Sequence, residues 1–283
     1  MISTVTFTPA LVGASAITLH SSSTRQLTKI DGLVGTPSVR SVQRALPGRD
    51  GVSDDSRYLD SRNIVLEGEL WGATGGAALE DLSLVTSAFQ TTLLSPGKLT
   101  VTYENGTVRW TNVKLAGAID SSVEGASRLV SYQVQLVAPD PRWYSTTLNT
   151  SALGISASVA TTSSTNTVVH AGTAPSNPLF TWTGGTGTGR LIDKVTVNVP
   201  AAYATLSPQG SAIILDDSGT ASPLTSGDYV DTFARTTTLD SLSSVTEWPV
   251  FYPGSSTWNW SIQLSGGSGG TTTCTASWYD AWW

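Results

Sequence analysis

Cysteine and histidine are almost absent from this chain. Of its 283 residues one is a cysteine, Cys274, and two are histidines, His20 and His170. A single cysteine excludes an intrachain disulfide and leaves a thiolate metal site without its other ligands. The two histidines are far apart in the sequence, without the spacing of metal ligands. We therefore predict neither a metal site nor a cofactor.

Long apolar runs are missing as well. No stretch approaches the roughly 18 consecutive apolar residues that a membrane-spanning helix needs. The first residues, MISTVTFTP, do not combine a positive segment with an apolar one, so they do not resemble a secretory signal. We expect a soluble protein that is made in a reducing compartment and is not inserted in a membrane.

Charge is scarce, at 13% of the residues. Residues 1–145 carry 12 basic and 13 acidic residues and residues 146–283 carry 3 and 8, so the halves have net charges of −1 and −5, which sum to −6. The second half would repel a nucleic-acid backbone, and the first would not attract one. The charge therefore argues against nucleic acid as a partner.

A catalytic set is not recognisable, because no base, nucleophile and orienting group stand in a known arrangement. Carboxylates could serve a glycosidase only if paired at about 5 to 10 Å across a cleft. The candidates occur in turns and on one strand face, which favours solvated surface positions; they are Asp54-Asp55, Asp216-Asp217 and Glu67 with Glu69. We predict that the protein is not an enzyme, and a hydrolase is the weakest alternative.

Glycine, serine and threonine are abundant, which is typical of short strands joined by turns. The clearest strand is Val130 to Ala138, where apolar and polar residues alternate. Pro139 and Pro141 then stop it, because each lacks a backbone donor. Composition changes after this stretch. The length suits two domains, so we predict one domain over residues 1–145 and another over residues 146–283.

The first domain is predicted to be a β-fold with one packed helix. The helix spans about Gly76 to Leu93, with Leu79, Leu82, Val85 and Phe89 on its apolar side. A hairpin is expected around Asn105-Gly106, a pair suited to a type I′ turn. The charged region Thr24 to Arg62 predicts either an exposed β-arm or a solvated loop.

The second domain is predicted to be a β-sandwich of the jelly-roll or galectin-like kind, since turn signals recur about every ten residues. The expected strands are Leu179 to Thr183, Leu191 to Val199, Ser211 to Leu215, Asp228 to Phe233, Ser256 to Leu264 and Thr271 to Trp282. The stretch Asn149 to Thr167, rich in serine and threonine, gives only weak strand signals.

Seven of the ten tryptophans lie in the second domain. Trp258 and Trp260 are two apart in a predicted strand and therefore share a face. With Trp278 they would stack sugars if exposed, whereas in the core they would supply apolar burial. Core positions are the favoured interpretation, and glycan stacking is the alternative.

Short segments spread in order over nearly the whole chain carry a family resemblance. The most specific combination is Ala-Pro-Asp-Pro-Arg, residues 138–142, followed by Gly-Thr-Ala-Pro, residues 172–175. The others are Gly32-Leu33 with Pro37 to Arg44, Leu46 to Gly51, Arg62 to Glu69, the predicted helix, Tyr229 to Asp231 with Leu239-Asp240, Pro253-Gly254, and Trp278 to Trp283. Together they resemble the distal tail protein family of long-tailed, non-contractile bacteriophages.

This resemblance implies a structural protein of the virion, placed at the tail tip and made in the host cytoplasm. Its first domain would form a ring, usually a hexamer, that closes the distal end of the tail tube, and its second domain would project as a galectin-like sandwich. Expected partners are further copies of the chain, the tail tube protein, the tail hub protein and receptor-binding proteins. The interface residues expected in the charged region are Arg40, Arg44, Arg49, Arg57 and Arg62.

A competing hypothesis from the sequence is a carbohydrate-binding module that contacts a host cell-wall polysaccharide. It requires Trp258, Trp260 or Trp278 to be exposed and flanked by polar groups. A purely structural protein would bury all three side chains.

Overall fold

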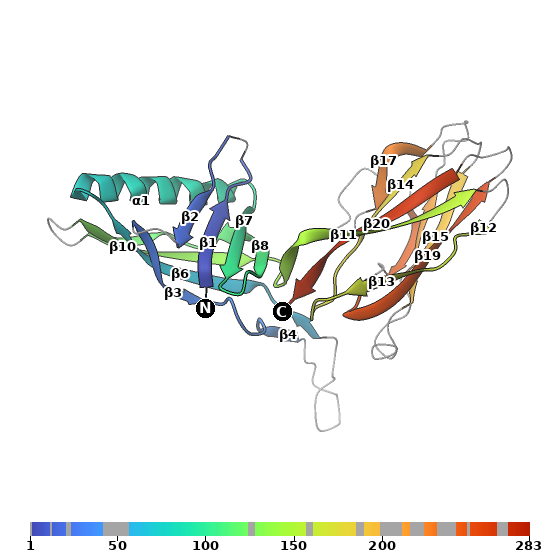
Figure 1. Ribbon diagram of the computed structural model, residues 1–283, viewed down its shortest axis with the longest axis horizontal. Coiled ribbons are helices and arrows are strands. Elements are labelled where there is room, and N and C mark those ends of the chain that lie inside the picture. Colours follow the sequence, from blue (N-terminus) through green and yellow to red (C-terminus); the bar gives the residue numbers. More distant parts are fainter. Residues whose placement is uncertain are drawn as a thin grey trace, which may run out of the picture. The chain divides into compact units, whose positions relative to one another are not determined.

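A computed structural model describes most of the chain and confirms a mainly β fold (Figure 1). The described residues are 2–11, 13–20, 24–41, 57–123, 128–156, 161–184, 190–198, 211–215, 224–230, 242–247, 250–264 and 271–283. They fall into two compact units, residues 1–146 together with Trp283, and residues 147–282. Among these residues no helix is long and apolar enough to cross a membrane.

The first unit contains two antiparallel groups of strands, which are joined where Lys114 and Leu115 of β8 pair with Val137 and Leu136 of β10. One has the strand order β2-β1-β7-β8 and the other β9-β10-β6-β3. The strands are β1 (Ile2–Thr8), β2 (Ile17–His20), β3 (Arg25–Asp31), β6 (Arg62–Trp71), β7 (Gly97–Tyr103), β8 (Val108–Leu115), β9 (Asp120–Val123) and β10 (Leu129–Ala138). A separate pair is β4 (Val39–Ser41) with β5 (Arg57–Leu59).

The helix α1 (Gly75–Gln90), extended by the 3-10 turn η1 (Thr91–Leu93), covers one face of β6 and β10 (Figure 1). It begins after Thr74, whose hydroxyl accepts a hydrogen bond from the Ala77 N–H at 3.2 Å. Phe89 packs on Phe7 of β1 with ring centroids 4.4 Å apart. Val85 and Phe89 are buried as predicted, whereas Leu79 is 47% exposed, so the prediction for Leu79 is wrong. Ala78 and Ala88 occupy the buried side instead, because their small side chains allow close approach to the sheet.

An ion pair fixes α1 to the edge of the sheet. Arg25 of β3 donates from Nε to both carboxylate oxygens of Asp81, at 3.0 and 2.8 Å, and Nη2 adds a further bond. The bonds to Asp81 and the negative charge there raise the pKa of Arg25, although burial opposes this. The charged region after Thr24 therefore starts as a sheet strand rather than as an arm.

Replacing Asp81 with asparagine is expected to destabilise the protein by about 1–2 kcal/mol, because the guanidinium loses its charge-assisted bonds at a partly buried site. Chemical unfolding measures the change. Glu80→Gln is the matched control, since Glu80 is exposed on the same helix turn. Equal stability of the two variants would contradict an anchoring role for Asp81.

The hairpin of β7 and β8 forms where it was predicted, but its turn is different. The Gly106 N–H donates to the Tyr103 carbonyl, and the Tyr103 N–H donates to the Thr107 carbonyl, both at 2.9 Å. This pattern is that of a three-residue loop with a bulge, not a two-residue type I′ turn. Gly106 takes the required positive φ of 81°.

The second unit has two facing antiparallel sheets with a shared core (Figure 1). One has the order β17-β14-β20-β11, and in the other β19 pairs with β12, β13 and β15, which is followed by β16 and β18. The strands are β11 (Trp143–Ser156, which crosses from the first unit), β12 (Thr161–Thr162), β13 (Asn166–His170), β14 (Leu179–Gly184), β15 (Arg190–Asn198), β16 (Ser211–Leu215), β17 (Leu224–Val230), β18 (Leu242–Glu247), β19 (Gly254–Leu264) and β20 (Thr271–Trp282).

Five of the predicted strands of this unit are confirmed with small shifts. Of the expected strand Asp228 to Phe233, residues 228–230 lie in β17, and residues 231–233 are outside the described residues. Strands β11, β12 and β13 include most of the described residues between Asn149 and Thr167, a stretch with only weak strand signals in its sequence. Cys274 is buried in the core, and this burial raises the pKa of its thiol well above the usual value.

Candidate functional site

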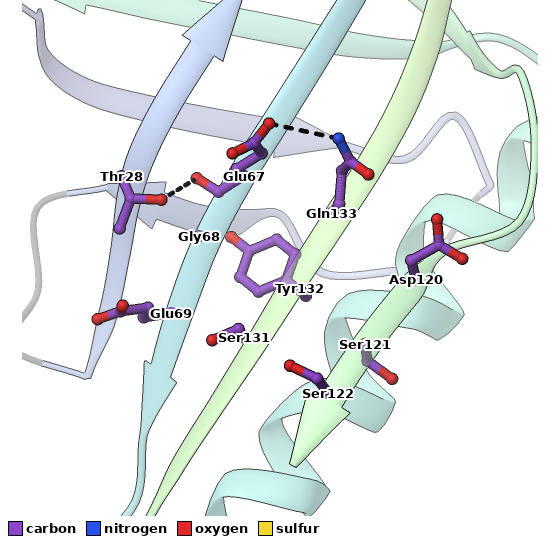
Figure 2. Close-up of a pocket in the computed structure, with 10 residues that line it drawn as sticks. All are labelled: Thr28, Glu67, Gly68, Glu69, Asp120, Ser121, Ser122, Ser131, Tyr132 and Gln133. Atoms are coloured by element: carbon purple, nitrogen blue, oxygen red, sulfur yellow. Dashed lines mark hydrogen bonds between the residues drawn. The ribbon is translucent and has the colours of Figure 1, made fainter. Parts of the chain in front are cut away.

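The sheet β9-β10-β6-β3 presents one polar face that α1 does not cover (Figure 2). Alternation explains it, since Ile64, Leu66 and Leu70 point to the helix side while Glu67 and Glu69 point away. This face contains an open depression of about 540 Å³. We define the polar face by seven residues that line this depression: Thr28, Glu67, Glu69, Asp120, Ser122, Ser131 and Gln133.

Hydrogen bonds link neighbouring strands across the polar face (Figure 2). The Glu67 carboxylate accepts from Gln133 Nε2 at 3.3 Å and lies 3.3 Å from Lys29 Nζ. The Thr28 hydroxyl donates to the Glu67 carbonyl at 3.2 Å. With Glu69 and Asp120, the face has three carboxylates and is well suited to contact with water.

Both edges of this sheet are open among the described strands. At one edge β9 pairs only with β10, and at the other β3 pairs only with β6. The Leu27 N–H of β3 is occupied by His20 Nδ1 at 3.2 Å, so the open part of β3 is Thr28 to Asp31. This part has four residues, the length of β9. Open edges are the places where sheets add further strands.

The strand directions would also allow the sheet to continue into a second copy of the chain. Each neighbouring pair in the order β9-β10-β6-β3 is antiparallel. Strand β3 therefore runs opposite to β9, and a second copy placed edge to edge would continue the antiparallel pattern. The polar face would then extend from one copy to the next.

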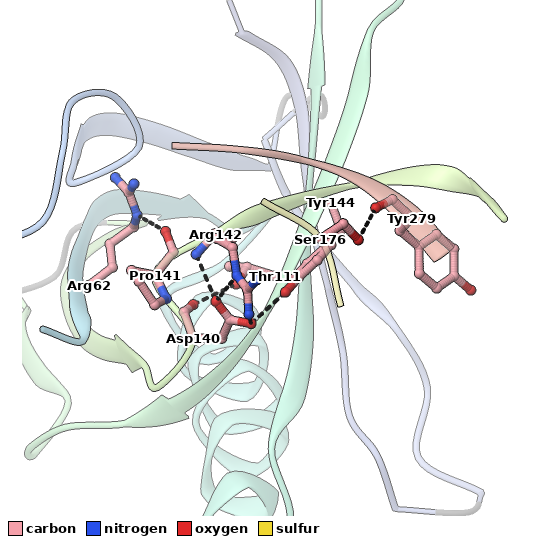
Figure 3. Close-up of polar contacts among 8 residues, drawn as sticks. All are labelled: Arg62, Thr111, Asp140, Pro141, Arg142, Tyr144, Ser176 and Tyr279. Carbon is pink, nitrogen blue, oxygen red and sulfur yellow. Dashed lines mark hydrogen bonds and ion pairs between the residues drawn. The ribbon is translucent and has the colours of Figure 1, made fainter. Parts of the chain in front are cut away.

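Arg62 lies inside the first unit and holds three backbone segments together (Figure 3). Its Nε donates to the Pro141 carbonyl at 2.8 Å, and its Nη1 donates to the carbonyls of Gly32 and Gly35 at 3.0 and 2.9 Å. The side chain is 3% exposed, and burial lowers its pKa. Arg62 therefore does not fit the predicted role of an exposed interface residue, because its donors face the interior of its own unit.

A second polar cluster follows the end of β10 (Figure 3). Arg142 donates to both carboxylate oxygens of Asp140 at 2.8 and 2.9 Å, and the Tyr144 hydroxyl also donates to Asp140. Burial and the charge of Asp140 raise the pKa of Tyr144. Burial of Arg142 lowers the pKa of its guanidinium, but the hydrogen bonds to Asp140 raise it, and the pKa is raised on balance.

Within the second unit, the Ser176 hydroxyl donates to the Tyr279 carbonyl at 2.6 Å.

Of the other predicted interface arginines, Arg40 is exposed on β4. Arg57 begins β5, but its side chain is outside the described residues. Arg44 and Arg49 lie outside the described residues altogether, as do the carboxylate pairs Asp54-Asp55 and Asp216-Asp217. No group of three or more potential metal ligands occurs in the described part of the chain.

The three candidate tryptophans are core residues. Trp258 and Trp260 are fully buried, and Trp278 is 5% exposed. Trp258 donates to the Ser151 hydroxyl at 3.0 Å, and Trp260 donates to the Leu153 carbonyl at 2.9 Å. These positions do not fit an exposed surface for stacking sugars, because both faces of each ring are enclosed by the second unit.

Sequence reasoning missed Lys29 and Asp120 as candidate site residues. Both lie at the open edges of the sheet, one on β3 and the other on β9. The segment Asp120 to Val123 has no apolar alternation, so its strand could not be predicted from periodicity.

Comparison with known proteins shows that the fold of this chain is similar to that of solved phage proteins. No family model matches the chain, and no curated protein matches it. The crystal structure of the Dit protein of phage SPP1, described as a paradigm of the hub adsorption apparatus in phages that infect Gram-positive bacteria, aligns with a TM-score of 0.51 and 13% identity. The alignment covers 96% of this chain and 98% of SPP1 Dit. A chain of the phage P2 baseplate in its activated conformation with calcium aligns with a TM-score of 0.43 and 9% identity, over 98% of both chains.

Proposed function

We propose that the protein is a structural component of a bacteriophage tail tip and forms a ring at the distal end of the tail tube. The observation that carries this proposal is the likeness to SPP1 Dit, which extends over nearly the whole length of both chains. The order of the sequence segments that resemble distal tail proteins supports the same role.

The geometry of the first unit supports a ring. Open edges on β3 and β9 allow a head-to-tail contact, in which each copy uses different surfaces toward its two neighbours. Such a contact closes into a ring when the rotation between copies is a simple fraction of a turn. The polar face of the sheet suits the water-filled inside of that ring, and α1 lies on the outside.

The ring number we propose is six, with the second unit as a peripheral galectin-like domain. The tail tube protein would contact one side of the ring, and the tail hub protein and receptor-binding proteins would contact the other. The protein has no enzymatic role in this proposal.

Mass photometry of the purified full-length chain tests the ring. We expect particles of six times the mass of the 29.6 kDa chain, and negative-stain electron microscopy should show them as rings with an open centre. Monomers alone, up to the highest soluble concentration, would overturn the proposal.

A further inference from the structure

The turn between β7 and β8 contains Asn105-Gly106, the only Asn-Gly pair in the sequence. An asparagine that precedes glycine deamidates most readily, because glycine has no side chain to hinder attack by its own backbone nitrogen. Both residues are exposed, and a Cβ atom added to Gly106 would meet nothing within 4 Å. The pair is therefore accessible to water and to bases in solution.

Deamidation of Asn105 would use a cyclic imide formed by the chain itself. The Gly106 nitrogen gives its proton to a base in solution and attacks Cγ of Asn105. A bond forms between this nitrogen and Cγ, and the bond from Cγ to Nδ2 breaks as ammonia leaves with a proton from solution. Water then opens the imide at either carbonyl, to give aspartate or isoaspartate. Water is the only co-reactant, and nothing is oxidised or reduced.

Hydrogen bonds in the closed turn oppose the first step. The Gly106 N–H donates to the Tyr103 carbonyl at 2.9 Å, so its proton is not available to a base. The Asn105 side-chain oxygen accepts from the Thr107 N–H at 3.1 Å, which restrains the side-chain rotation that the attack requires. The Tyr103 N–H closes the loop by donating to the Thr107 carbonyl. The turn must therefore open before Asn105 can react.

We propose that Asn105 is a deamidation site gated by this turn, and that it reacts only in molecules whose turn has opened locally. Local opening is expected at a hairpin tip, where Glu104, Asn105 and Gly106 are all exposed. Aspartate can keep the bond from the Thr107 N–H, because a carboxylate oxygen also accepts. Isoaspartate lengthens the main chain by a methylene group, so the three-residue loop cannot re-form, and opening becomes permanent in the molecules that take this route.

Peptide mapping by mass spectrometry tests the site and its gate in the full-length chain. The chain is incubated in mildly alkaline buffer, and fragmentation of the peptide with residue 105 distinguishes asparagine, aspartate and isoaspartate. We expect Asn105 of the folded chain to react at least roughly tenfold more slowly than Asn105 of the same chain in denaturant. Equal rates would overturn the gate. An Asn105 that stays intact in the denatured chain would overturn the site itself.

Two glycine variants separate local opening from unfolding of the whole unit. Glu104→Gly makes the turn more flexible, so this folded variant should deamidate about twofold to fivefold faster than the wild type. Ser83→Gly is the matched control, because Ser83 is exposed within α1 and glycine there destabilises the same unit without changing the turn. It should leave the rate at Asn105 unchanged. Equal acceleration in both variants, or none in Glu104→Gly, would overturn gating by the turn.

Discussion

Replacing Trp260 with alanine is expected to destabilise the second unit by about 3–5 kcal/mol, the usual cost of truncating a buried aromatic side chain. Trp260 has no exposed surface and lies in the core between the two sheets. Its indole N–H also donates to the Leu153 carbonyl of β11, which joins β19 of one sheet to the opposite sheet. Alanine leaves a cavity and removes this bond.

Thermal or chemical unfolding of the full chain measures the effect, and Leu148→Ala is the control. Leu148 is 49% exposed, so its truncation should change the free energy of unfolding by less than about 1 kcal/mol. A Trp260→Ala protein with wild-type stability would contradict the core assignment. It would also return Trp260 to consideration as a surface for sugars.

The strands with strong apolar alternation could be predicted from the sequence. β6 and β10 are examples, since every second residue of each is buried against α1 or the core. The helix was also predicted, but its buried side was not fully predicted. Periodicity places Leu79 near the apolar side, yet Leu79 is 47% exposed, while its neighbour Ala78 is fully buried and makes the close contact in the first turn of α1.

Strands with little apolar alternation could not be predicted. The polar strand β9 and the serine- and threonine-rich β12 carry few apolar residues, and their place in a sheet depends on backbone pairing with β10 and β19. Backbone pairing leaves little trace in a sequence, because every residue except proline can contribute to it. One open edge and part of the polar face depend on β9, so this part of the candidate site could not be predicted from the sequence.

A charged residue type also fails to predict exposure where the fold buries the charged side chain. Arg62 follows a charged segment and reads as part of an exposed arm, but it begins β6 with its side chain on the buried side. What makes burial possible is a set of carbonyl groups that come from distant positions in the sequence. A buried charge is tolerated only where such partners converge.

Replacing Arg62 with methionine is accordingly expected to destabilise the first unit by about 3 kcal/mol, since the carbonyls of Gly32, Gly35 and Pro141 lose their charged donor in the interior. The backbone near Gly32 cannot rearrange easily. Its φ is +83°, and a Cβ atom there would lie 2.0 Å from the Asn63 carbonyl oxygen, so β6 and the Gly32 turn are in direct contact. Methionine keeps most of the side-chain volume and isolates the loss of hydrogen bonds.

Hydrogen exchange measured by mass spectrometry locates the effect of Arg62→Met. Faster exchange is expected in peptides from residues 32–41 and from the start of β11, because Arg62 ties both to β6, while peptides from β19 and β20 should exchange as in the wild type. Arg40→Met is the control, since Arg40 is exposed on β4 and its loss should change stability by less than about 0.5 kcal/mol. If the two variants are equally stable and form rings equally well, Arg62 is not the residue that holds these segments. If Arg62→Met loosens only its own unit and also weakens rings, the segments that it ties together contribute to the contact between copies.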